Sequence, residues 1–202
     1  MISHDHKCIF IHIPKCAGNS IDVFFTGRHQ RHGCMLDYED QLGVAKLSTY
    51  FKFTVVHNPW DRIVSYFSFV KKLIQNENQP NKEMLISEYG IDFTFDDFVK
   101  NKLNVLIVGG TKYVNKLKTA NQIDWIKNSK NELDIDYICK FENLQYDFNE
   151  VCDKIGIPQQ QLSHKNKTHH KHYTEYYDDV TREIVANRYA EDIEYFGYKF
   201  GE

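Results

Sequence analysis

A short loop near the N-terminus carries the residues best suited to bind an anion. Residues 14–20 read Pro-Lys-Cys-Ala-Gly-Asn-Ser, so one lysine stands among small residues. The loop follows an apolar run at residues 8–13 and precedes Ile21, Val23 and Phe24, whose spacing predicts the buried face of a helix. Because helix N-terminal amides and a lysine ammonium both attract negative charge, this strand, loop and helix predict a phosphate or sulfate site.

The order of residues in this loop differs from the ATP-binding loop of nucleotide kinases. In that motif, G-x-x-x-x-G-K-[ST], the lysine follows the second glycine, whereas Lys15 precedes Gly18, the only glycine of the loop. The position of the lysine therefore weighs against an ATP-dependent small-molecule kinase, which stays open as the alternative enzyme class.

The same succession of strand, turn and helix occurs again further along the chain. Residues 51–56 are predicted to form a strand that ends at an Asn-Pro pair, and residues 60–74 carry apolar side chains at helical spacing. Later elements continue the alternation, with a strand expected at 136–141 and helices at 144–155 and 175–195. Alternating strands and helices predict an α/β fold with a parallel sheet.

Composition sets the class of protein. The chain has 202 residues, of which 42% are hydrophobic, and we expect a single domain spanning 1–202. A net charge of −3 gives no general attraction to nucleic acid or to an anionic membrane, and no apolar run approaches the ~20 residues of a membrane span. Five cysteines without a CxxC pair indicate a reducing cytoplasm.

Several segments resemble the sulfotransferases related to the Golgi carbohydrate enzymes. Residues 9–20 resemble their 5′-phosphosulfate loop, and residues 53–66 are similar to their 3′-phosphate segment. Further signatures of that family are matched, in the same order, at residues 140–144, 164–168 and 196–200. The resemblance implies a P-loop-kinase-like sulfotransferase fold with a central parallel sheet flanked by helices. It also implies 3′-phosphoadenosine 5′-phosphosulfate (PAPS) as the donor, a saccharide hydroxyl as acceptor, and no metal.

The resemblance implies roles for single residues as well. Lys15 would contact the bridging oxygen of the phosphosulfate, and the loop at residues 16–20 would bind the 5′-phosphate. Ser65 would hold the 3′-phosphate, and the nucleotide would be covered by Lys167 and Thr168. The complete set implied for the donor is Lys15, Cys16, Ala17, Gly18, Asn19, Ser20, His57, Ser65, Lys167 and Thr168.

Two positions depart from the pattern of that family. His57 stands where relatives usually have arginine, and Asn19 stands where they usually have threonine. Arginine offers a permanent charge and a planar fork for phosphate, whereas histidine offers fewer donors and a charge that depends on pH. A phosphate dianion nearby favours the charged ring, so His57 is kept as a ligand. A catalytically weak protein that binds 3′,5′-adenosine bisphosphate (PAP) remains the alternative outside the enzymes.

Sulfuryl transfer also needs a group that accepts the proton of the acceptor hydroxyl. His29 and His32 lie between the two nucleotide segments. In relatives a histidine precedes a tyrosine and a Leu-Gly pair, and here His32 precedes Tyr38 in that way, so His32 is predicted to be the base and His29 the reserve. His12, within an apolar strand, is expected to be a hydrogen-bonded core histidine.

Two further ligand classes are disfavoured. Four histidines between residues 164 and 172 lack cysteine or carboxylate partners at known metal-ligand spacing, so we expect no metal site there. The aromatic residues follow helix and strand periodicity without interleaved arginine and lysine, so we expect no nucleic-acid partner.

Overall fold

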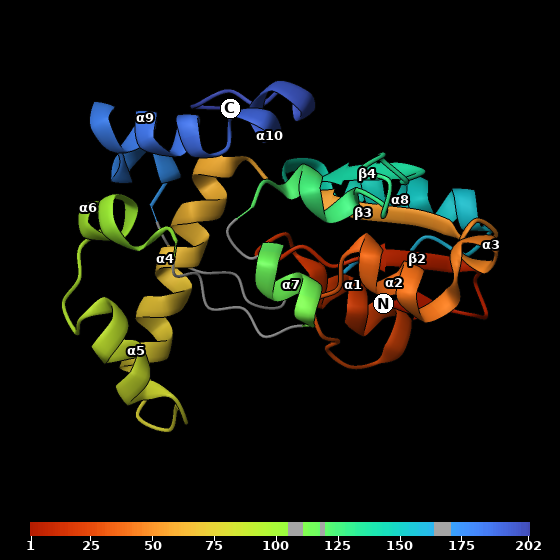
Figure 1. Cartoon of the computed structure of the whole chain (residues 1–202), viewed down its shortest axis with the longest axis horizontal. Coiled ribbons are helices and arrows are strands. Elements are labelled where there is room, and N and C mark those ends of the chain that lie inside the picture. The colour runs from red at the N-terminus through yellow and green to blue at the C-terminus, as the bar shows by residue number, and fades with distance from the viewer. Residues whose placement is uncertain (105–110, 118–119, 164–170) are drawn as a thin grey trace. The chain divides into compact units, whose positions relative to one another are not determined.

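One four-stranded sheet organises the part of the chain that contains the loop after Ile13 (Figure 1). The computed structural model describes residues 1–104, 111–117, 120–163 and 171–202. Its residues cluster into two compact units, the first formed by Met1–His57 with Ile107–Lys165 and the second by Asn58–Leu106 with Asn166–Glu202. Each unit is described by itself.

The sheet of the first unit contains the strands β1 (Ile2–Ser3), β2 (Cys8–Ile11), β3 (Phe51–Val56) and β4 (Tyr137–Lys140) in that spatial order. β2 pairs with β3 and β3 pairs with β4 in parallel, whereas the short edge strand β1 is antiparallel to β2. The parallel α/β arrangement predicted from the alternating pattern is confirmed. Because parallel strands end at the same edge of a sheet, the segments that follow β2 and β3 begin side by side.

Helices cover this sheet with aromatic side chains. α1 (Gly18–Thr26) and α8 (Leu144–Ile155) meet where Phe24 lies against Phe148 with ring centroids 5.0 Å apart, and Phe25 of α1 reaches Phe53 of β3. Because β2 is buried along its whole length, its residues carry no surface role and form the centre of the core. The other helical segments are α2 (Met35–Leu42), α3 (Val44–Leu47), α7 (Lys112–Leu117) and the short 3-10 helices η2 (Gln122–Ile126) and η3 (Phe141–Asn143).

The second unit is helical. Its longest helix, α4 (Pro59–Gln75), buries Phe67 against Phe93, Phe95 and Phe98, with ring centroids 5.3 to 5.7 Å apart. These rings anchor the segments that follow α4, since a buried aromatic cluster contributes more than area alone. The remaining helical segments are α5 (Lys82–Tyr89), α6 (Phe95–Asp97), the wide turn η1 (Phe98–Lys102), the 3-10 helix η4 (Tyr173–Tyr176), α9 (Asp179–Arg188) and α10 (Ala190–Phe196).

The C-terminal helix differs from the prediction. A single helix was expected over residues 175–195, but the structure has a 3-10 turn followed by two helices. Asp178 starts α9, because its carboxylate accepts a hydrogen bond of 2.7 Å from the backbone N–H of Thr181. Tyr189, with φ −116°, separates α9 from α10. The N-cap at Asp178 thus starts a new helix inside the segment 175–195, which apolar spacing predicted to be one helix.

Within the described ranges, every helix is too short or too polar to cross a lipid bilayer.

Candidate functional site

The loop between β2 and α1 has a backbone that is unusual for its residue types. Lys15 and Ala17 both adopt the left-handed region, with φ 67° and 56°, although neither is glycine. Such a conformation costs roughly 1–2 kcal/mol per residue and is retained mainly where function requires it. Ala17 is also the N-cap of α1 and offers no side-chain hydrogen bond to the first helical amides. The backbone N–H groups at the start of α1, together with the Lys15 ammonium, therefore suit the binding of an anion.

Exposure alternates along this loop. Cys16, Gly18 and Ser20 are buried, whereas the positions between them, and Lys15 before them, remain partly accessible. Ser20 Oγ donates to the carbonyl of Ser163 at 2.8 Å, so one end of the loop is tied to the segment after α8. The buried positions anchor the loop, and the accessible positions face away from the core.

Gln122 holds the loop to the end of β3. This residue of η2 is fully buried, and its Oε1 accepts from the backbone N–H of His57 at 2.9 Å and from the Cys16 thiol at 3.2 Å. Its Nε2 donates to the His57 carbonyl at 2.9 Å. One amide side chain therefore connects the loop after β2 with the segment after β3. The sequence analysis missed Gln122, because its partners lie 65 and 106 residues away.

His57 supports the loop from the same side. Its Nδ1 lies 3.0 Å from the backbone carbonyl oxygen of Lys15, and because a carbonyl only accepts, Nδ1 is the donor. The ring also packs on Phe141, with centroids 3.9 Å apart, and His57 is 1% exposed. His57 therefore contacts the loop backbone. The expectation that it binds the 3′-phosphate stays a prediction, and that contact would use the Nε2 edge of the ring.

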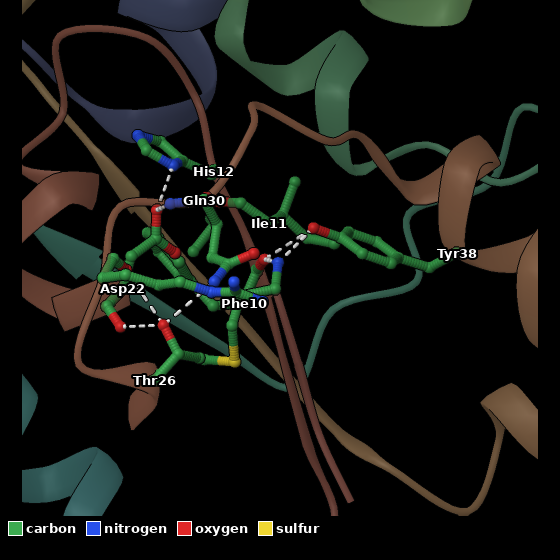
Figure 2. Close-up of polar contacts among 10 residues, drawn as sticks. Phe10, Ile11, His12, Asp22, Thr26, Gln30 and Tyr38 are labelled. Carbon is green, nitrogen blue, oxygen red and sulfur yellow. Dashed lines mark hydrogen bonds and ion pairs between the residues drawn. The ribbon is translucent and has the colours of Figure 1, made fainter. Parts of the chain in front are cut away.

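A buried ion pair joins the residue that follows β2 to α1 (Figure 2). His12 Nδ1 is 2.8 Å from Asp22 Oδ2, and the two side chains are 3% and 0% exposed. His12 is thus a buried histidine with a polar partner, as its place in an apolar strand predicted. Its ring also contacts the loop, since a Cβ added to Gly18 would lie 2.1 Å from His12 Nε2 and Cδ2. Only glycine fits at position 18 beside this ring.

His32, the predicted base, lies beside His12. The two ring centroids are 4.5 Å apart. His32 borders a cavity of about 570 Å³ in the first unit, whose lining includes the cationic side chains of Arg28 and Arg31. His29, the reserve candidate, lines the same cavity. The base assignment to His32 or His29 therefore stays a prediction.

The short segment that carries His32 is fixed on both sides of this residue. The backbone N–H of Gln30 donates to Asp22 Oδ2 at 3.2 Å, and the Gln30 side chain donates to Thr26 Oγ1 at 3.0 Å (Figure 2). At the other end, the His12 N–H donates to the Gly33 carbonyl at 3.2 Å. One anchor lies on α1 and the other, His12, directly follows β2, so His32 is held by the same parts of the chain that hold the loop before α1.

Ser65 and the Asn-Pro turn belong to the second unit. Asn58 caps α4 by accepting from the Trp60 N–H at 3.1 Å, and its Nδ2 donates to the Lys199 carbonyl at 3.0 Å. Phe200 packs on Trp60 with ring centroids 5.5 Å apart. Asn58 and Trp60, from the matched segment 53–66, therefore touch the matched segment 196–200 within this unit. Ser65 itself lies half-buried on α4.

Two predicted ligands cannot be placed. Lys167 and Thr168 lie outside the described residues, as do His164, His169 and His170. Among the residues that are described, no three histidine, cysteine, aspartate or glutamate side chains come together as metal ligands would.

Comparison with known proteins gives two matches. The model of a family described as the sulfotransferase family matches residues 1–199, which span both units. An uncharacterized protein of Archaeoglobus fulgidus is 24% identical over 121 residues, which cover 60% of this chain and 80% of that protein. No solved structure matches the chain.

Proposed function

Since the chain belongs to the sulfotransferase family, we propose that it transfers a sulfuryl group from PAPS to an acceptor hydroxyl. The observation that supports this activity most strongly is the conformation of the loop before α1. Lys15 and Ala17 are held in left-handed conformations there, and the loop is anchored from behind by Gln122 and His57. A loop that retains such strain at a helix N-terminus is suited to bind a charged group.

The donor would be held mainly by the loop. In this proposal the amides of Ala17, Gly18, Asn19 and Ser20 bind the 5′-phosphate, and the loop contains Cys16, whose thiol is turned to Gln122. The ammonium of Lys15 contacts the bridging oxygen between phosphorus and sulfur. Negative charge grows on this oxygen as its bond to sulfur breaks, and a fixed cation beside it stabilises the transition state more than the ground state.

The 3′-phosphate would be bound by residues that follow β3. We assign this role to His57 and Ser65, with Lys167 and Thr168 covering the nucleotide. The assignment is supported by the family match across this region and by the place of His57 at the end of a parallel strand. It also explains why a buried histidine stands at this position, where its ring can serve the loop through Nδ1 and a ligand through Nε2.

The acceptor would enter the cavity beside His32. Its volume of about 570 Å³ lies in the range of small-molecule sites, and the polar side chains of Arg28, Asp37 and Gln41 in its lining could bind the hydroxyls of an acceptor such as a saccharide. The acceptor oxygen forms a bond to sulfur while the bond from sulfur to the bridging oxygen breaks. The hydroxyl proton moves to a ring nitrogen of His32, and PAP leaves. No covalent intermediate with the protein is required.

Ligand-dependent thermal stability tests the donor. PAP at 100 times its dissociation constant should stabilise the native protein by about 2.7 kcal/mol, which raises Tm by about 5–10 °C for a chain of this size. ATP with magnesium should give a much smaller shift. A protein stabilised by ATP with magnesium and not by PAP is a kinase, and stabilisation by PAP without turnover on any saccharide indicates a PAP-binding protein.

Lys15→Met is the matched variant for this test. Methionine keeps the length and the left-handed backbone penalty of the lysine but removes its charge. We expect the variant to retain most of the PAP-dependent stabilisation and to lose at least about 10²-fold in kcat. Normal turnover by Lys15→Met would remove Lys15 from the reaction.

A further inference from the structure

The pair formed by His12 and Asp22 has no role in the chemistry described so far, yet it is costly to bury. Both side chains are almost fully inaccessible, and Asp22 Oδ1 has no hydrogen-bond partner among the described residues. A charged carboxylate in an apolar interior costs several kcal/mol, and well-packed apolar side chains at the same two positions would commonly be as stable. Stability alone therefore does not explain the pair.

The contact with Asp22 determines how the His12 ring is protonated. A carboxylate oxygen can only accept, so the proton between Asp22 Oδ2 and His12 Nδ1, 2.8 Å apart, is carried by Nδ1. This contact also fixes the rotation of the ring, which places the edge formed by Nε2 and Cδ2 against Gly18. The Asp22 carboxylate thus sets the orientation of the His12 ring, and this ring contacts the loop before α1 at Gly18.

Asp22 has a second contact that leads to His32. The same Oδ2 atom accepts from the backbone N–H of Gln30, two residues before His32 in the chain. The His32 ring in turn lies 4.5 Å from the His12 ring. One carboxylate therefore touches the segment that carries His32 and also orients the ring on which His32 packs. Figure 2 shows this carboxylate between His12 and Gln30.

We propose that Asp22 and His12 are positioning residues for the sulfuryl transfer, which set the loop at Gly18 and the ring of His32 relative to each other. The two groups that must act together are the loop, which bears Lys15, and the base. His12 is the side chain that contacts both, and Asp22 holds it in place through an ion pair that is close in distance but not aligned as a hydrogen bond. Partners of this kind typically contribute 10–100-fold to the activity of the site that they support.

Nitrogen-15 NMR of the histidine rings tests the geometry without any ligand. In the wild type, His12 Nδ1 should be protonated. In Asp22→Asn, which conserves shape, we expect the ring resonances of both His12 and His32 to shift. Asp134→Asn is the control, because it removes a carboxylate 2.8 Å from the buried Lys52 ammonium in the same unit. It should shift neither ring. An unprotonated Nδ1 in the wild type, or unchanged His32 resonances in Asp22→Asn, would overturn the proposal.

A double-mutant cycle tests the contact with the loop and covers the case in which Asp22→Asn does not fold. Gly18→Ala places a Cβ against the His12 ring, and overpacking of this kind should lower Tm by roughly 2–12 °C. In a His12→Ala background the ring is absent, so the same change should lower Tm by much less. Equal losses in the two backgrounds would show that the ring does not set the loop.

The turnover rate distinguishes a positioning role of Asp22 from a purely structural one. Of these experiments, only this measurement rests on the proposed function. Asp22→Asn should lower kcat about 10–100-fold and change PAP affinity by less than about threefold, whereas Asp134→Asn should leave both unchanged. Equal kcat in Asp22→Asn and the wild type would sink the inference. A wild type that PAP does not stabilise would instead sink the donor assignment, and the NMR result would still decide whether Asp22 orients the two rings.

Discussion

The imidazole of His57 donates from Nδ1 to the backbone carbonyl of Lys15 across 3.0 Å, so the residue after β3 supports the loop after β2. The lysine assigned to the bridging oxygen is thus held in its left-handed conformation by a histidine assigned to the other end of the nucleotide. The two nitrogens of this ring have separable duties, Nδ1 toward the protein and Nε2 toward the proposed ligand. An asparagine amide can replace Nδ1 alone, and a glutamine amide can replace Nε2 alone.

His57→Asn should keep the contact with Lys15 and lose the contact with the 3′-phosphate. The asparagine amide can donate from about the position of Nδ1 but does not replace the ring that packs on Phe141, so Tm should fall less than in His57→Ala, while PAP affinity falls about tenfold, the loss of one charge-assisted hydrogen bond. His57→Ala should lower PAP affinity and lower Tm by roughly a further 2–12 °C, because it also removes the donor to the Lys15 carbonyl. Melting curves with and without PAP measure both effects. Full PAP affinity in His57→Asn would exclude a phosphate contact.

The two cavity histidines can be ranked by kinetics. If His32 is the base, His32→Ala should lose about 10²-fold or more in kcat while PAP binding stays nearly intact, because the proton acceptor acts in the transition state. His29→Ala is the matched control, since His29 lines the same cavity and is exposed. It should change kcat by less than about threefold. A larger loss in His29→Ala than in His32→Ala would transfer the role of base to His29.

Gln122 should be important for stability although it has no proposed contact with a ligand. Gln122→Leu conserves volume but leaves the backbone N–H and C=O of His57 without the partners that they have in the native state. Each of the two lost partners costs about 1–3 kcal/mol, so Tm should fall by roughly 4–24 °C. Gln159→Leu, at an exposed glutamine, is the control and should leave Tm within about 2 °C. Similar melting curves for the two variants would contradict the role of Gln122 as an anchor.

Features encoded by neighbouring residues were predicted well from the sequence. The strand expected at 51–56 is β3, the helix expected at 144–155 is α8, and the segment at 14–20 leads from β2 into α1, which begins at Gly18. These elements are marked by local apolar spacing and by Gly or Pro at their ends. The division of the C-terminal helix was missed although its signal, the capping residue Asp178, was also local.

Features that depend on distant residues were not predicted. Gln122 stands in a short 3-10 helix and becomes part of the site only because folding brings it to Cys16 and His57. Asp22 could have been suspected, since a charged residue between Ile21 and Val23 on the buried side of α1 needs a partner. That its partner is His12, and that His12 touches His32, follows from tertiary packing alone.

The cysteines should be unreactive in the native protein and should make it less stable at alkaline pH. All five are buried thiols, and burial raises the pKa of Cys8 and of Cys34 to about 12 and raises that of Cys139 further. A raised pKa keeps the thiol protonated at pH 8, so a thiol reagent should modify the native protein far more slowly than the unfolded protein. In the unfolded protein the reagent should modify all five cysteines.

The sign of the pH effect follows from the same shifts. In the unfolded chain these thiols ionise near pH 8.5, whereas in the native state Cys8 and Cys34 stay protonated until about 12. The unfolded state therefore binds fewer protons above pH 8.5, and the free energy of unfolding should fall as pH rises through the range from about 8.5 to 12. Urea unfolding at pH 7.5, 9 and 10 measures this. Cys139→Ala removes one titrating thiol and should flatten the decline, and an identical slope in wild type and variant would show that buried thiols do not cause it.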